Sequence, residues 1–148
     1  MSAKIIQIAD AVVALLNAGE FDLEFEAARR YVVDFKLQGE LDELRVSVAV
    51  RDDDETGASR ANRQHDYGID VGVQQKVDPS NLEILDGLVA FVEAIHDHLA
   101  APENRRLPGL TEAVLSHIRI EPIYAPDHLG ERRVFTSVIR ATYRAIRA

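Results

Sequence analysis

The chain contains no cysteine and no tryptophan, and its acidic side chains outnumber its basic ones. Without cysteine there are no disulfide bonds, thiolate metal sites or cysteine nucleophiles, which fits a reducing compartment. Aromatic residues make up only 6% of the chain, which argues against a surface that stacks nucleic-acid bases. With 25 acidic and 17 basic side chains the formal net charge is −8, so we expect no broad cationic surface for duplex nucleic acid.

Long apolar runs are also missing. The unbroken apolar run near the N-terminus, residues 11–16, is too short for a signal sequence or a membrane span. We therefore expect a soluble protein made in the cytosol. At 148 residues, 47% of them hydrophobic, the chain has the size of one domain covering 1–148. Such a domain buries about 68–70% of the surface that its unfolded chain exposes.

Two segments carry apolar residues at helical spacing. The first covers 3–17 and ends before Gly19. The second follows Asp78, the predicted N-cap, with Pro79 at the first helical position, and it continues to Pro102. Apolar and polar residues alternate in further segments, which predicts strands at 31–37, 44–51, 66–74, 118–121 and 133–146.

These elements predict an α+β fold, with a mostly antiparallel or mixed sheet of about four strands and two main helices packed on one face. Residues 21–26 also alternate and are either a short strand or an extended connection. Residues 52–64 contain no apolar side chain larger than alanine, so we predict a long mobile loop between two paired strands. We expect residues 103–109 to be a loop as well.

The acidic run at the start of the predicted mobile loop has some of the spacing of a calcium loop. Gly57 stands at the sixth position only if Asp52 is the first, and the twelfth position, which needs a bidentate acid, is then Arg63. A cation at that position argues against calcium binding, so we interpret the run as a solvated loop.

No other motif predicts a catalytic, metal or cofactor site. His96 and His98 are two residues apart on the predicted helix and point to different faces. Asp66 and Asp70 share one strand face, where they could do acid–base work, although alternation alone also places them there. We predict that the protein is not an enzyme and uses no cofactor.

Charge is distributed unevenly along the chain, with an acidic run at 52–55 and an arginine-rich C-terminal strand. Opposite charges on separate elements can meet in head-to-tail contacts between copies, which close into rings. An ordinary charged outer face explains the same pattern. The candidate interaction residues are Asp52, Asp53, Asp54, Glu55, Arg60, Arg63, Arg132, Arg133, Arg140 and Arg144.

Three segments together resemble a known family. They are residues 2–12 (SAKIIQIADAV), 66–77 (DYGIDVGVQQKV) and 122–129 (PIYAPDHL), the last continuing to 133–139. In sequence and element order they resemble small phage and prophage head–tail joining proteins of the tail terminator, or tail-completion, type from long-tailed bacteriophages. The resemblance covers nearly the whole chain, and its motifs are packing and turn sequences.

The resemblance implies a structural virion protein, made in the host bacterial cytoplasm and located in the tail or neck. Such proteins form a ring, usually hexameric, that caps the tail tube and stops its polymerisation. The implied partners are further copies of the chain, the tail tube protein and the head–tail connector. DNA passes through the ring without sequence-specific binding, and no membrane is involved. The predicted loop at 52–64 would suit an arm that becomes ordered on docking.

Two alternatives remain open from the sequence. One is a different neck component, such as a head-completion or connector adaptor. The other is a small soluble ligand-binding module that uses Asp66, Asp70 and Tyr67 on one sheet face.

Overall fold

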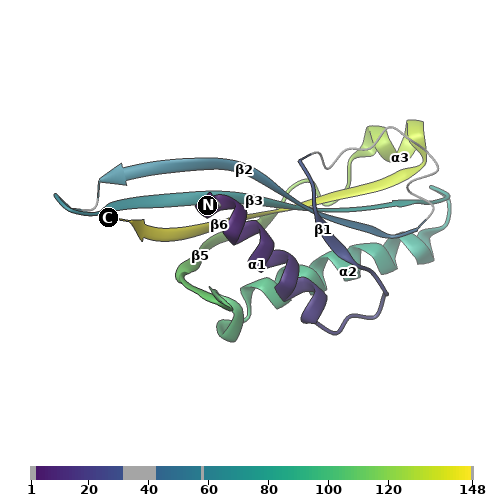
Figure 1. The fold of residues 1–148 in the computed structure, drawn as a ribbon. Helices are drawn as coiled ribbons and strands as arrows, with labels where there is room; N and C mark the ends of the chain where they lie inside the picture. The colour runs from purple at the N-terminus through teal and green to yellow at the C-terminus, as the bar shows by residue number, and fades with distance from the viewer. Residues whose placement is uncertain (1–2, 32–42, 58, 148) are drawn as a thin grey trace.

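The computed structural model describes residues 3–31, 43–57 and 59–147, which form three α-helices and a six-stranded sheet (Figure 1). The α+β class is therefore confirmed. In chain order the elements are α1 (Lys4–Ala18), β1 (Ala27–Arg29), β2 (Arg45–Gly57), β3 (Arg63–Lys76), α2 (Leu82–Ala100), a 3₁₀ turn (Pro102–Asn104), β4 (Arg106–Leu107), β5 (Leu110–Ile120), α3 (Pro126–Arg132) and β6 (Val134–Arg147).

The sheet has the strand order β1-β2-β3-β6-β5-β4. β1 pairs with β2 in parallel and every other pair is antiparallel, so the expected mixed sheet is confirmed. The expected number of about four strands is too low. β1 and β4 are three and two residues long, too short to show any alternation in the sequence. The predicted strand at 31–37 lies, apart from Tyr31, outside the described residues.

One face of the sheet is packed against α1 and α2. Along β3 the apolar residues of the alternating pattern are all buried, and most of their strand partners join the same core, among them Val46 and Val48 on β2 and Ile139, Ala141 and Tyr143 on β6. Both helices direct one apolar stripe at this face. The helix residues that are fully or almost fully buried there include Ile8, Val12, Leu16, Leu88, Val92 and Ile95.

The start of α2 differs from the prediction. The helix begins at Leu82, and its N-cap is Asn81, whose side chain accepts a hydrogen bond from the Ile84 N–H at 3.3 Å. Asp78 instead accepts hydrogen bonds from the backbone N–H and the hydroxyl of Ser80, at 3.0 and 2.8 Å. These bonds favour the ionised carboxylate and lower the pKa of Asp78. Because the Asp78 carboxylate is already hydrogen-bonded to Ser80, the Asn81 side chain caps the helix instead.

A third helix, α3, was not expected from the sequence. It has seven residues and no buried side chain, so it carries no apolar stripe that a pattern could reveal. Figure 1 shows α3 at the end of the sheet where β6 begins, away from α1 and α2. The predicted loop at 103–109 is also wrong in part, because it contains β4.

The prediction of a mobile loop at 52–64 is wrong. β2 continues through the acidic run to Gly57, and β3 begins at Arg63, so only a short turn separates the two strands. After a bulge between Val50 and Asp52, the register continues from Asp52 opposite Gly68 to Gly57 opposite Arg63. The polar composition suggested a loop, but main-chain pairing with β3 does not depend on apolar side chains.

Candidate functional site

The far ends of β2, β3 and β6 form a three-stranded arm, which we define as residues 52–57, 63–66 and 144–147 (Figure 1). In Figure 1 these strand ends extend beyond the helices that cover the rest of the sheet. Every residue of β2 from Asp52 to Gly57 is exposed. Among the described residues, no strand pairs with the outer edge of β2 beyond Val48, so the arm presents an open backbone edge.

The helix side of the arm is organised around one histidine. The His65 ring is 8% exposed and lies between two carboxylates, with Nδ1 2.7 Å from Asp53 Oδ1 and Nε2 3.2 Å from Glu55 Oε1. It also stacks on the ring of Tyr67 at a centroid distance of 5.4 Å. Arg63 Nε lies 3.7 Å from the same Glu55 oxygen. Two acidic side chains of the arm are thus held in place by groups on β3.

The opposite face of the arm carries a ladder of ion pairs. Arg144 Nε donates to Asp66 Oδ1 at 2.9 Å, and this carboxylate raises the pKa of the Arg144 guanidinium. Further along β3, Asp70 pairs with Arg51, the residue at the β2 bulge. Gly68 stands between the two aspartates, and a Cβ there would collide with the side chains of Arg51 and Asp52. Gly68 therefore makes room for these charged groups.

The ligand set proposed from Asp66, Asp70 and Tyr67 is not assembled. Both aspartates lie on the outer face and are paired with arginines, whereas Tyr67 points into the core and is 1% exposed. Neighbouring residues on a strand face opposite ways, so Tyr67 cannot join the aspartates in one site. The ligand-binding alternative fails in that form.

The predicted interaction residues fall into four places. The arm contains Asp52, Asp53, Asp54, Glu55, Arg63 and Arg144, and Arg60 lies in the turn that joins β2 to β3. Arg140 stands in the middle of β6 opposite Asp70, and its Nε is buried with no hydrogen-bond partner among the described residues. Arg132 and Arg133 lie at the end of α3, where β6 begins. Because β2 and β6 both flank β3, some opposite charges pair within one chain.

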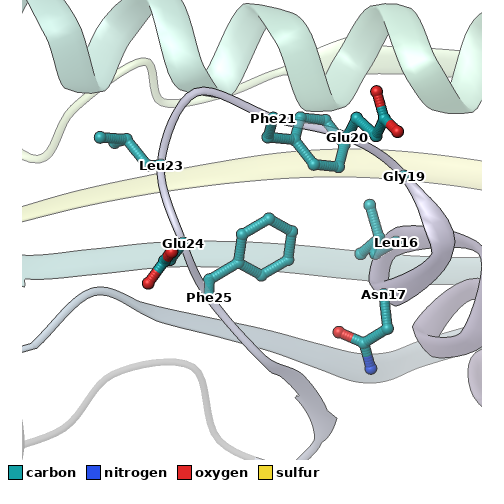
Figure 2. A pocket seen from close by; sticks show the side chains of 8 residues that line it. All are labelled: Leu16, Asn17, Gly19, Glu20, Phe21, Leu23, Glu24 and Phe25. Carbon is teal, nitrogen blue, oxygen red and sulfur yellow. The ribbon is translucent and has the colours of Figure 1, made fainter.

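A second surface feature, which we call the loop pocket, lies at the C-terminal end of α1 (Figure 2). The end of α1 and the connection from α1 to β1 line an open hollow of about 440 Å³. Figure 2 shows Leu16, Phe21 and Phe25 around the hollow and the carboxylates of Glu20 and Glu24 on opposite sides of it. The complete lining is Leu16, Asn17, Gly19, Glu20, Phe21, Leu23, Glu24 and Phe25.

The loop that forms this pocket is held at both ends. The Asn17 side chain donates to the Ala27 carbonyl oxygen at 3.1 Å and accepts from the Ala27 N–H at 2.8 Å. The Phe21 and Phe25 rings both pack nearly perpendicular to the Phe91 ring on α2, at centroid distances of 5.9 and 5.3 Å. A Cβ on Gly19 would lie 2.7 Å from the Phe21 ring, so glycine permits this close packing.

His98 supports the pocket from α2. Its Nε2 lies 2.9 Å from the Leu15 carbonyl oxygen, to which it donates, and its ring packs edge-on against Phe21 at 5.3 Å. His96 instead lies beside Asp97, with 3.1 Å between Nδ1 and Oδ1, and the two helix histidines do not share a site.

Sequence analysis missed the loop pocket. The alternation at 21–26 left a strand and an extended connection as alternatives, and the structure shows an irregular connection. The alternation was a partial signal for the pocket, because Phe21 and Phe25 are half-buried and the acids between them are exposed, whereas Leu23 is exposed as well.

Within the described ranges, no group of three or more histidine and acidic side chains could hold a metal ion. None of the helices in this part of the chain has the length and hydropathy needed to cross a bilayer. Neither a comparison with protein-family models nor one with curated proteins finds a match to this chain.

Proposed function

We propose that this protein is a structural assembly protein that forms a ring at the end of a phage tail tube, stops tube growth and joins the tail to the head. The observation that carries the proposal is the arm. It is an ordered, three-stranded extension whose β2 edge is open and whose tip buries few side chains.

An open strand edge offers unpaired N–H and C=O groups to another chain. Proteins that present such edges use charged side chains to prevent indiscriminate pairing, and the four acidic residues at 52–55 have this effect. An edge that is both open and charged favours a partner of matching charge over unspecific aggregation. This is the property that an assembly protein needs.

The charge of the whole chain supports the same proposal. A net charge of −8 makes free copies repel one another. Self-association is then weak until a template brings the copies together, which is how a terminator must act if it is to form rings at tube ends. An acidic or neutral lumen would also let DNA pass, because cations lining it would retain phosphates.

The test is to polymerise the tail tube protein from the same phage genome with and without this chain. We expect tubes that stop growing and carry a ring-shaped cap at one end in negative-stain images. Unchanged tube lengths without caps, or decoration along the tube walls, would contradict the proposal.

The experiment also separates the proposed terminator from a connector adaptor. An adaptor would bind isolated head–tail connector rings and leave tube growth unaffected. A terminator changes tube length in the absence of the connector. Binding to connectors alone would therefore replace the proposal with the adaptor alternative.

A further inference from the structure

We infer that the loop pocket is the docking site for the end of β6 from a second copy, with Ile146 entering the pocket and Arg144 facing its acidic rim. The inference rests on the proposed function, because it assumes self-assembly, and it names the two surfaces that meet.

The chemistry of the loop pocket defines what it can bind. Its lining combines apolar side chains, among them Leu16, Phe21 and Phe25, with polar ones, and the two glutamates make it acidic. Between residues 19 and 28 the chain has four acids, Glu20, Asp22, Glu24 and Glu26, and no basic residue. A matching segment needs an exposed apolar side chain with a cation beside it, because an acidic neighbour would be repelled.

Two exposed apolar pairs of the chain do not fit this description. Leu82 and Ile84 on α2 are 69% and 49% exposed, but Glu83 lies between them in the sequence. Ile123 and Tyr124 are 51% and 46% exposed, and the nearest charged residues in the sequence are Glu121 and Asp127. Both pairs would bring further negative charge to the acidic rim.

Tyr31 has basic neighbours, but the structure shows them engaged elsewhere. The Arg29 guanidinium pairs with Asp10 at 3.0 Å and lies over the Tyr31 ring, 5.7 Å from its centroid. The Arg30 guanidinium donates to the Val46 carbonyl oxygen and to the Ser47 hydroxyl, at 3.3 and 3.1 Å. The Arg29 side chain is 31% exposed, less than that of Arg144, and it lies over the very ring that would have to enter the pocket, while Arg30 is directed at β2.

Ile146 does fit. It is 50% exposed and is flanked in the sequence by Arg144 and Arg147. Residues two apart on a strand point to the same face, so Ile146 and the Arg144 guanidinium are presented together. The Arg144 side chain is 49% exposed, and a guanidinium has five N–H donors. It can therefore keep its ion pair with Asp66 and also donate a hydrogen bond to a carboxylate of the pocket rim.

The two surfaces lie apart on the molecule. In Figure 1 the C-terminus lies at the arm, while the connection that follows α1 lies beside α2, below the middle of the sheet. They cannot meet within one chain. A contact between two different surfaces is head-to-tail, and such contacts repeat from copy to copy until a ring closes.

The test uses two variants of the full chain. Ile146→Asp damages the β6 end, and Glu20→Lys/Glu24→Lys reverses the pocket rim; all three positions are exposed, so both variants should keep the wild-type unfolding midpoint. Ile84→Asp is the matched control, because it makes the same change at a side chain of nearly equal exposure (49%). Self-association is measured by sedimentation at low salt, up to millimolar concentration.

We expect each variant alone to associate at least about tenfold more weakly than wild type, and Ile84→Asp to match wild type. A one-to-one mixture of the two variants should form dimers and nothing larger, because each pair keeps one intact interface and cannot extend. A strictly monomeric mixture, wild-type association by Ile146→Asp, or a wild type that stays monomeric at millimolar concentration would overturn the inference.

The same variants separate this inference from the proposed function. If Ile146→Asp still caps tail tubes with normal rings, the docking surfaces are wrong and the terminator function stands. If wild type forms rings that both variants abolish, but these rings leave tube growth unchanged, the docking surfaces are right and the terminator function is wrong.

Discussion

The two ends of β3 illustrate two uses of one sheet. In the body, Val71 pairs with Val48 and Ile139, and all three side chains are fully buried beneath the helices. In the arm, the same strand continues without interruption from Asp66 back to Arg63, but its partners on β2 are all exposed and none of them is a large apolar residue. Main-chain pairing is common to both ends, whereas apolar burial belongs almost entirely to the body, with Ala145 as the buried apolar residue of the arm. The body therefore contains most of the buried apolar surface, and we propose that the arm supplies a surface for contacts.

The largest expected effect comes from removing apolar contacts in the body. Ile95 of α2 is fully buried, so Ile95→Ala should lower the free energy of unfolding by about 2 to 5 kcal/mol. Asp54→Ala, at an exposed position of the arm, should stay within about 0.5 kcal/mol of wild type. Urea unfolding of the three proteins measures both values. If both substitutions lowered the free energy of unfolding equally, the distinction between body and arm would be wrong.

The loop pocket is attached to the body, and Asn17→Ala tests that attachment. The substitution leaves the Ala27 N–H without its partner, and Ala27 is only 3% exposed. We expect a loss of about 1 to 3 kcal/mol in unfolding free energy, as for other buried groups left unpaired. Asn17→Asp is the control: its carboxylate can still accept from the Ala27 N–H but cannot donate to the carbonyl oxygen. A loss as large as that of Asn17→Ala would show that the bond to the N–H contributes little.

The smallest expected effect on stability comes from shortening the arm. Replacing residues 56–64 with Asn-Gly keeps Glu55 opposite His65 and closes the strands with a favoured two-residue turn. We expect cooperative unfolding, with a midpoint closer to wild type than that of Ile95→Ala. Self-association should nevertheless fall, because Ile146 loses its β3 partner Gln64. Circular dichroism during urea unfolding, and sedimentation, measure the two properties. A variant that no longer unfolds cooperatively would show that the arm belongs to the folding unit.

Much of the body was predictable because its signals are local. The helical spacing of Ile8, Val12 and Leu16 and the alternation along 66–74 depend only on which residues must face the core. The same reasoning failed at 52–57, where the strand is held by partners that are distant in the sequence or across a turn. It failed again at α3, which has no buried side chain to create a pattern.

For the candidate surfaces, too, local sequence patterns predicted one part and failed to predict another. The acidic run and the arginines of β6 were evident from composition, but their separation into an arm, a mid-sheet position and the end of α3 was not. Nor could alternation at 21–26 show that Phe21 and Phe25 pack on Phe91, a residue of α2 far along the chain.

The sequence by itself determined the α+β class, the faces of the helices and strands that are buried, and the uneven charge. These features follow from residue periodicity, which every short segment carries within itself. Only the tertiary structure decided that the acidic run is a strand, that β6 extends beside it, and that a phenylalanine loop closes over the end of α1. Each of these depends on hydrogen bonds or ring contacts between separate segments, across a turn for the acidic run and between distant parts of the chain for the other two. These contacts form only when the chain folds.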